Sequence, residues 1–189
     1  MFSPTRLLAL GCAALTVTVG VAMVGAPADA AGRDLRERDA NTARAPYRGR
    51  MRAPVEIGFV RVVLDEQKTY VFNTRRRLIT TIPSSTGLDD TTPTGTFRVF
   101  SKSAQTFYAP NPAEKMKWMV RFTKGREGGN IGFHGIPYRV KGSVEVPFPT
   151  PLGDEPSSHG CVRLAVRDAR WLFENIGIGT TVSVVRSRD

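Results

Sequence analysis

From Val55 onward, short runs of β-branched and aromatic residues alternate with turn-forming residues along the chain. Three such runs lie close together, separated by short polar stretches: VEIGFVRVVL (55–64), KTYVFN (68–73) and LITTIP (78–83), with Asp65-Glu66-Gln67 and Asn73-Thr74-Arg75 between them. Runs of this kind are typical of strands, because branched and aromatic side chains pack well on a pleated surface. Consecutive strands joined by short turns predict a β-meander.

More strands are expected further along the chain. Gly87 and the turn Pro93-Thr94-Gly95 form an irregular loop before a strand near 96–101, and later runs lie at Trp118–Phe122, Asn130–His134 and TTVSVVR (180–186). Between 104 and 116, AQTFYAPNPAEKM contains two prolines and two aromatic residues. This composition predicts a long loop, either a lid over a site or a surface excursion.

One segment has helical periodicity. Apolar residues recur from Ala165 at i+4, i+7, i+8 and i+11, and the stripe consists of Ala165, Ala169, Leu172, Phe173 and Ile176. Gly177 and Gly179 are expected to end this helix. The chain is therefore predicted to be mostly β, of β-sandwich or meander type, with one main α-helix that follows Cys161.

The first thirty residues have the pattern of an export signal. Arg6 precedes an apolar run from Leu7 to about Val24, and Ala28-Asp29-Ala30 fits an A-x-A cleavage site. This predicts a signal peptide at 1–30; an uncleaved N-terminal anchor is the alternative, because the run approaches the length of a bilayer span. We expect an exported protein of the periplasm, the cell wall or the extracellular space.

The rest of the chain divides into a tether and a domain. Residues 31–53 have few large apolar side chains and no usable period, which predicts a basic, flexible tether. Residues 54–187 are numerous enough for one domain with its own core.

The balance of charged residues narrows the choice of partners. Lys and Arg number 27 against 17 Asp and Glu, which gives a net charge of +10. For an exported protein, the matching polyanions are the anionic polymers of the cell envelope. The arginines of 33–52 lack the aromatic and glycine patterning of nucleic-acid binding, so we expect no nucleic acid as a partner. We also expect the protein to be a monomer.

Cys161 is the candidate nucleophile. It is the sole cysteine left after signal cleavage, and such a thiol is either reactive or a small buried residue. A cysteine attacks as the thiolate and needs a base, which histidine usually supplies. The chain has two histidines, His134 in GFHGIP and His159 in SHGCV, each followed by glycine. Gly160 lets the backbone approach a substrate carbonyl, so the N–H groups of Gly160 and Cys161 are candidate oxyanion donors.

Two other residue patterns leave alternatives open. Arg163 could bind a substrate carboxylate through two hydrogen bonds, or it could lie on the surface. The residue types of a zinc site are also present, with His134, His159 and Cys161 as ligands and Asp154 or Glu155 as a fourth. Their spacing matches no familiar zinc pattern, so we expect neither a metal nor another cofactor.

The motif SHGCVR (158–163), with FHGIP (133–137) upstream, resembles the L,D-transpeptidase catalytic domain of the YkuD family. The likeness extends over about 55–185 and includes STG followed by TPTGTF, and DARWLFENIGIGTTVSV after the cysteine. It implies a cysteine acyltransferase of bacterial cell-wall biogenesis that cross-links peptidoglycan stem peptides and is acylated by carbapenems.

The resemblance also implies roles for individual residues. The cysteine matching Cys161 attacks the carbonyl that joins the third, diamino acid residue to the terminal D-alanine, and an acceptor amine resolves the thioester into a 3→3 cross-link. His134 is then the general base, and the Gly135 carbonyl orients its imidazole. The remaining motif residues would shape the substrate pocket: Ser158, His159 and Arg163.

One departure from the family pattern concerns the pocket edge. His134 and Ser158 are separated by 23 residues, more than in many members, and the inserted residues 141–157 leave the substrate preference open. Water in place of the amine would make the enzyme an L,D-carboxypeptidase. A non-catalytic wall-binding domain is a further alternative, against which the intact Cys161, His134 and Arg163 argue. A sortase-like ligase is another, but SHGCVR does not resemble the sortase signature.

Overall fold

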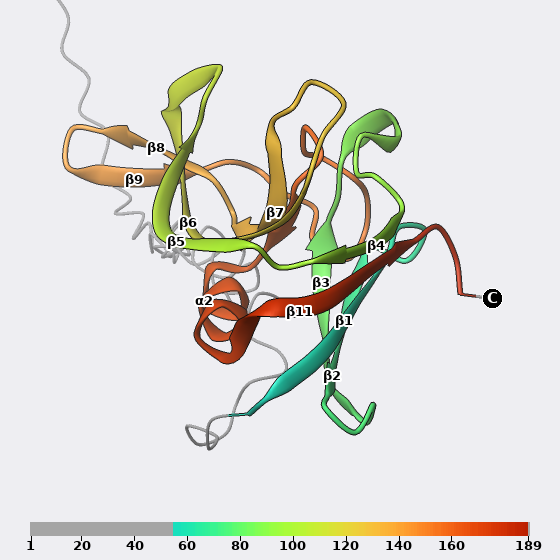
Figure 1. Ribbon diagram of the computed structural model, residues 1–189. Coiled ribbons are helices and arrows are strands. Elements are labelled where there is room, and N and C mark those ends of the chain that lie inside the picture. Colours follow the sequence, from blue (N-terminus) through green and yellow to red (C-terminus); the bar gives the residue numbers. More distant parts are fainter. Residues whose placement is uncertain (1–54, 189) are drawn as a thin grey trace, which may run out of the picture. The chain divides into compact units, whose positions relative to one another are not determined.

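A computed structural model describes residues 55–188, which contain eleven strands, a short 3-10 turn and one α-helix (Figure 1). The predicted signal peptide (1–30) and tether (31–53) lie outside the described residues. The strands are β1 (Ile57–Val63), β2 (Lys68–Asn73), β3 (Leu78–Ser85), β4 (Gly95–Arg98), β5 (Ser101–Tyr108), β6 (Asn111–Lys124), β7 (Asn130–Gly135), β8 (Tyr138–Lys141), β9 (Val144–Pro147), β10 (Val162–Leu164) and β11 (Ile176–Val185). The turn is η1 (Leu88–Asp90) and the helix is α2 (Val166–Asn175).

The strands form one mixed, hydrogen-bonded array in the order β4-β11-β1-β2-β3-β10-β7-β6-β8-β9, with β5 paired to β6. β1 runs parallel to β11, and β7 runs parallel to β10, whereas the other pairs are antiparallel. β3 joins the two halves, because most of it pairs with β2 while Ser84 and Ser85 pair with β10. The mostly β fold and the β1-β2-β3 meander are therefore confirmed.

The hydrophobic core is built from strands of both halves of the array together with α2. Val60 and Val62 of β1 are fully buried, and Leu172 of α2 packs in the same cluster. Phe122 and Phe133 bring adjacent strands together, with ring centroids 5.0 Å apart. The helix packs against β6 and β7, so it supports the strand that carries His134 from the core side. None of the helices in residues 55–188 is long and apolar enough to cross a membrane.

The predicted long loop at 104–116 is wrong. These residues form the ends of β5 and β6, which pair as a hairpin from Ser101↔Arg121 to Tyr108↔Asn111 (Figure 1). The prolines did not break the strands because Pro110 lies in the turn and Pro112 near the start of β6, where fewer ladder bonds are lost.

Several other boundaries differ from the sequence prediction. The expected strand near 96–101 is two strands, β4 and β5, and the last strand begins at Ile176, so that Gly177 and Gly179 lie within β11. The inserted residues 141–157 include the turn and the second strand of a hairpin that the sequence did not predict, β8–β9. Glu145 of this hairpin pairs with Lys117 of β6, their side-chain atoms 2.7 Å apart, which ties the insertion to the sheet edge.

Candidate active site

The parallel pairing of β7 with β10 brings the predicted base beside the residues that directly follow the predicted nucleophile. Arg163 is in register with His134, and Val162 is in register with Phe133. Val162 and Phe133 point into the core. Because side chains alternate along a strand, His134 and Arg163 project from the opposite face. Cys161 comes directly before β10, where it packs at the edge of the core and is near enough to Arg163 for the guanidinium to act on its pKa.

The His134 imidazole is held in one tautomer. Its side chain is buried at 2% relative exposure, and Nδ1 lies 2.7 Å from the carbonyl oxygen of Gly135. A carbonyl can only accept, so Nδ1 carries the hydrogen and Nε2 keeps its lone pair. Burial lowers the His134 pKa to about 4, helped by the positive charge of Arg163 and opposed by the Gly135 hydrogen bond. The imidazole is therefore a neutral base at neutral pH.

The Cys161 thiol is half-buried, and Sγ lies 3.7 Å from the carbonyl oxygen of Asn130, to which it donates. Burial raises the pKa of Cys161, whereas a hydrogen bond from the Gly132 N–H and the guanidinium groups of Arg163 and Arg121 act to lower it. The resting pair is thus a neutral thiol and a neutral imidazole. The same N–H and cations are in place to stabilise the thiolate once the proton leaves.

Among the described residues, no hydrogen bond joins the Cys161 thiol to the His134 imidazole, since the thiol donates to Asn130. The thiol must therefore leave the Asn130 carbonyl before His134 can take its proton. Catalytic hydrogen bonds are often longer in a free enzyme than in its substrate complex, so this arrangement is compatible with a cysteine–histidine pair.

Ser158 fixes the backbone around the nucleophile. Its Oγ donates to the carbonyl of Cys161 at 2.6 Å and accepts from the Gly160 N–H at 3.0 Å. The Gly160 N–H is therefore engaged within the loop, and it would have to leave Ser158 to serve as the predicted oxyanion donor. The N–H of Cys161 is the remaining candidate of the two.

The backbone at Gly160 admits no side chain. Its φ is +131°, and a Cβ there would lie 2.8 Å from Cδ1 of Ile131 and 2.9 Å from the carbonyl oxygen of Thr91. Both the conformation and the packing require glycine at this position. The glycine before the nucleophile is needed for the loop itself, in addition to any approach by substrate.

His159 lies apart from the buried pair. Its side chain is exposed and stacks on Tyr108, with ring centroids 4.8 Å apart and an interplanar angle of 3°. Tyr108 stands at the end of β5, so the tip of the β5–β6 hairpin contacts the loop that carries Cys161. Sequence reasoning missed Tyr108 because it assigned that segment to a loop.

Arg163 is neither a surface residue nor a free carboxylate ligand. It is buried, its Nη1 donates to the carbonyl of Ser157 at 2.9 Å, and its Nη2 lies 3.6 Å from Oε1 of Glu114, which is buried too. Burial lowers the Arg163 pKa, and Glu114 acts to raise it. Arg163 Nε is buried without a hydrogen-bond partner. Sequence reasoning missed Glu114. The only indication in the sequence was a single acidic residue at a position of β6 that the fold buries.

The STG and TPTG motifs support the catalytic loop. Thr92, the first residue of TPTG, is buried; its Oγ1 accepts from the Gly87 N–H at 2.7 Å and donates to the Gly160 carbonyl at 2.8 Å. The carbonyl of Thr86 accepts from the N–H groups of Ser157 and Ser158 at 2.9 and 3.0 Å. Both motifs therefore hold the residues that precede Cys161.

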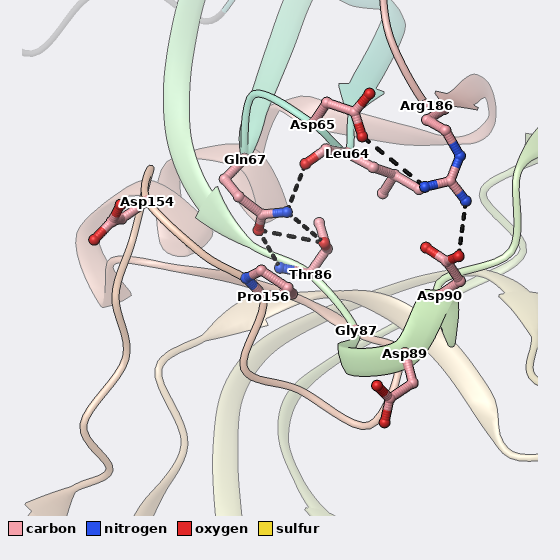
Figure 2. Close-up of a pocket in the computed structure, with 10 residues that line it drawn as sticks. All are labelled: Leu64, Asp65, Gln67, Thr86, Gly87, Asp89, Asp90, Asp154, Pro156 and Arg186. Carbon is pink, nitrogen blue, oxygen red and sulfur yellow. Dashed lines mark hydrogen bonds and ion pairs between the residues drawn. The ribbon is translucent and has the colours of Figure 1, made fainter.

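Thr86 is in turn held by Gln67, as Figure 2 shows. The Gln67 side chain accepts from the Thr86 N–H at 2.8 Å and donates to the Leu64 carbonyl at 2.6 Å. Behind this contact lies a cavity of about 300 Å³, where Arg186 approaches Asp90 at 2.9 Å and Asp65 at 4.0 Å. The cavity contains none of the predicted catalytic residues.

The metal alternative finds no ligand set. Within residues 55–188, no group of three or more His, Cys, Asp or Glu side chains is placed to hold a metal ion. His134 is bonded to Gly135, and His159 is stacked on Tyr108, so the two histidines of the zinc hypothesis face different surroundings.

Comparison with known proteins identifies the class to which this fold and site belong. The family model of the L,D-transpeptidase catalytic domain, YkuD, matches residues 58–184, and the chain belongs to this family. A protein of Bacillus subtilis (strain 168) named "Putative L,D-transpeptidase YciB" is 32% identical over 130 residues, which cover 67% of this chain and 64% of that protein.

Solved structures share the fold. A structure of LD transpeptidase LdtMt1 in complex with imipenem has a TM-score of 0.53 and 22% identity, and the match covers 67% of this chain and 58% of that chain. An L,D-transpeptidase from Stackebrandtia nassauensis has a TM-score of 0.52 and 22% identity, with coverage of 82% and 66%. The chain thus spans less than two thirds of the length of YciB and of LdtMt1.

Proposed function

We propose that this protein is a peptidoglycan L,D-transpeptidase that forms 3→3 cross-links through an acyl-enzyme on Cys161. The observation that carries the proposal is the 2.7 Å contact between His134 Nδ1 and the Gly135 carbonyl. This contact leaves Nε2 of a neutral, buried imidazole as a base on β7, the strand that pairs with the residues directly after Cys161. Membership of the YkuD family supplies the substrate class.

The first half-reaction forms the thioester. His134 Nε2 takes the thiol proton, and the thiolate attacks the carbonyl of the third residue, which carries the bond to D-alanine. The N–H of Cys161 is the candidate donor to the oxyanion. As the tetrahedral intermediate collapses, the imidazolium gives its proton to the D-alanine nitrogen, the C–N bond breaks, and D-alanine leaves.

The second half-reaction transfers the acyl group. The side-chain amine of an acceptor stem peptide attacks the thioester carbonyl and loses a proton to His134. Collapse of this intermediate breaks the C–S bond, and the imidazolium returns the proton to the thiolate. The free enzyme is regenerated, and one donor tetrapeptide and one acceptor have become one cross-linked product and one D-alanine.

Incubation of the protein with purified tetrapeptide muropeptides, followed by mass analysis, tests the proposal. A dimer lighter than two substrates by one D-alanine is expected, and Cys161→Ala and His134→Ala should abolish or greatly lower its formation. A tripeptide alone would make the protein an L,D-carboxypeptidase. No product would favour a non-catalytic wall-binding domain.

The same acyl-enzyme chemistry implies reaction with a carbapenem; the related LdtMt1 was solved in complex with one, imipenem. The Cys161 thiolate would attack the strained lactam carbonyl, and the opened ring would stay bound to the enzyme as a thioester.

We also propose that the protein acts outside the cytoplasm after removal of residues 1–30. N-terminal sequencing of the exported protein should then begin at Ala31.

A further inference from the structure

A groove of about 340 Å³ lies on the outer face of the β1–β2 pair. It is lined by two aromatic and two basic residues: Phe59, Arg61, Phe72 and Arg76. Phe59 of β1 and Phe72 of β2 are cross-strand partners, and their ring centroids are 5.6 Å apart. Because side chains alternate along a strand and Val60 points into the core, Phe59 and Arg61 project from the opposite face. The groove therefore has an aromatic floor and is bordered by cations.

Two guanidinium groups lie over one ring of this floor. Cζ of Arg76 is 4.5 Å from the Phe59 ring centroid, and Cζ of Arg61 is 5.7 Å from it. The ring holds each guanidinium in place, while the N–H groups at the guanidinium edge stay available to an acceptor. The two distances place the charges within about 10 Å of each other, which is the Debye length at 0.1 M salt. The two cations repel each other at this separation, and an anion bound beside both would offset the repulsion.

The turn between β2 and β3 fixes the position of Arg76. Asn73 Oδ1 accepts from the N–H groups of Arg75 and Arg77, both at 2.9 Å, and the Asn73 carbonyl accepts from the Arg76 N–H at 3.0 Å. Arg76 has a φ of +58°, in the left-handed region. The turn therefore has one defined shape, in which three consecutive arginines are exposed.

These arginines have no acidic partner in the part of the chain that the structure describes. Within residues 55–188, no Asp or Glu forms an ion pair with Arg61 or with the three arginines of the turn. Arg186 and Arg188, at the end of the chain, differ in this respect, because both are paired with acids. The groove and its turn thus carry a local excess of positive charge that a ligand could balance.

The groove is remote from Cys161. The turn directly precedes Leu78, the first residue of β3, whereas Ser84 and Ser85 at the other end of β3 pair with β10, which follows Cys161 (Figure 1). A strand of eight residues is about 23 Å long, at about 3.3 Å per residue. A ligand in the groove would therefore leave the candidate active site open.

We propose that this groove binds a poly(polyol phosphate) chain of the cell envelope and so anchors the catalytic domain to the wall. The inference goes beyond the proposed reaction and does not depend on it. A stacked guanidinium presents forked N–H groups that match the oxygens of a phosphodiester. The CH groups of the polyol would pack on the half-buried ring of Phe72. Six bonds separate successive phosphorus atoms of a glycerol phosphate chain, about 7 Å at the extension of a peptide chain, so Arg61 and Arg76 could each bind one of two consecutive phosphates.

A single polymer chain fits this face better than a lipid surface does. Proteins that lie on a bilayer insert large apolar side chains between the headgroups. Leu78 is the one exposed large apolar residue of β1, β2 and β3, and Phe59 is buried. This face therefore has little apolar surface to insert, and its polar contacts line a concave groove.

Calorimetric titration of the wild-type protein with poly(glycerol phosphate) of defined length, at several salt concentrations, tests the inference. Arg61→Gln/Arg76→Gln should weaken binding at least tenfold and reduce its salt dependence, because fewer phosphates are neutralised. Arg61→Lys/Arg76→Lys should also weaken binding, since lysine keeps the charge but cannot form the forked hydrogen bonds. Thermal unfolding should show that each variant is folded.

Arg139→Gln/Lys141→Gln is the matched control, because it removes the same amount of charge from β8, in the other half of the array. Both residues are exposed, and Arg139 also lies over an aromatic ring, with Cζ 4.8 Å from the Phe148 centroid. The control should bind the polymer as wild type does. A control that loses as much affinity as the groove variant would overturn the inference, and so would a lysine variant with wild-type affinity. Either result would show a general attraction between charges.

Two more ligands test the chemistry of the partner. Poly-glutamate presents carboxylates, and vesicles of phosphatidylglycerol present the same glycerol phosphodiester on a bilayer. We expect both to bind more weakly than the polymer and to be little affected by Arg61→Gln/Arg76→Gln. Equal or tighter binding of either ligand, lost in this variant, would overturn the assignment to a phosphodiester chain.

Turnover of soluble tetrapeptide muropeptides separates this inference from the proposed function. Arg61→Gln/Arg76→Gln should keep the wild-type rate, because the groove is remote from Cys161. A parallel loss of turnover would show that the substitutions disturb the active site and would overturn the inference. If the wild-type protein binds the polymer through the groove but leaves muropeptides unchanged, the groove site stands and the proposed reaction fails.

Discussion

The buried His134 should make the stability of the protein depend on pH between about 4 and 6.5. Its pKa is lowered from 6.5 to about 4 in the folded chain, because burial disfavours the imidazolium. Between these values the unfolded chain binds a proton that the folded chain does not. The contribution of His134 to stability is therefore fully present above pH 6.5 and is lost as the pH falls. Below about pH 4 both states are protonated and the loss is complete.

The size of the effect follows from the difference between the two pKa values. A shift from 6.5 to about 4 corresponds to about 3 kcal/mol in total. At pH 5 the unfolded state is almost fully protonated and the folded state hardly at all, so about 2 kcal/mol of this should already be lost relative to pH 8. That loss is a large fraction of the stability of an ordinary domain.

Urea unfolding at pH 5, 6, 7 and 8 measures the effect in wild type, His134→Gln and His159→Gln. Other groups also contribute: burial raises the pKa of Asp168, which works in the opposite direction, but its contribution cancels in the difference between two variants. In His134→Gln, the decrease in the free energy of unfolding from pH 8 to pH 5 should be about 2 kcal/mol smaller than in wild type. His159→Gln, a change at an exposed histidine, should keep the wild-type slope. Equal slopes in wild type and His134→Gln would refute the reasoning.

Three substitutions test the supports of the nucleophile. Thr92→Val removes the hydrogen-bond partner of the Gly87 N–H and of the Gly160 carbonyl, and each unsatisfied group costs about 1–3 kcal/mol of stability. The variant should lower kcat and slow alkylation of the Cys161 thiol, and Thr92→Ser should restore both. A fully active Thr92→Val would show that Thr92 does not support the nucleophile. Glu114→Gln leaves the buried Arg163 without its charge partner, so it should lower the free energy of unfolding by about 3 kcal/mol. Because Glu114 acts to raise the pKa of Cys161, the same variant should be alkylated faster at pH 7. Slower alkylation of the folded variant would contradict this. Gly160→Ala should abolish activity and lower the melting temperature, since its Cβ has no space; an active variant with the wild-type melting temperature would contradict the packing.

The regular part of the fold was predictable because local signals and tertiary packing agree. The β1-β2-β3 runs and the α2 stripe contain enough apolar periodicity to specify their own secondary structure. The β5–β6 and β8–β9 hairpins were missed because prolines and polar residues weaken the local strand signal. Pairing between neighbouring strands, which a sequence does not display, determines their structure.

The motifs of the sequence supplied the catalytic candidates, whereas the residues that surround these candidates in the structure belong to no motif. Cys161, His134 and Gly135 were identified from the sequence, and the His134–Gly135 contact has the expected partners. Glu114, Arg121 and Tyr108 carry no motif, and they reach the site only because the β5–β6 hairpin folds beside β7. The engaged Gly160 N–H likewise depends on the rotamer of Ser158, which spacing cannot reveal.

The reactivity of Cys161 toward an acyl donor is the most direct test of the central claim. Intact-mass measurement after carbapenem treatment, followed by peptide mapping, reports whether a covalent adduct forms and where. We predict one added drug mass on Cys161, absent in Cys161→Ala and slower to form in His134→Ala. A folded wild-type protein that shows no adduct on Cys161, and that also leaves tetrapeptide muropeptides unchanged, would contradict the acyl-enzyme mechanism.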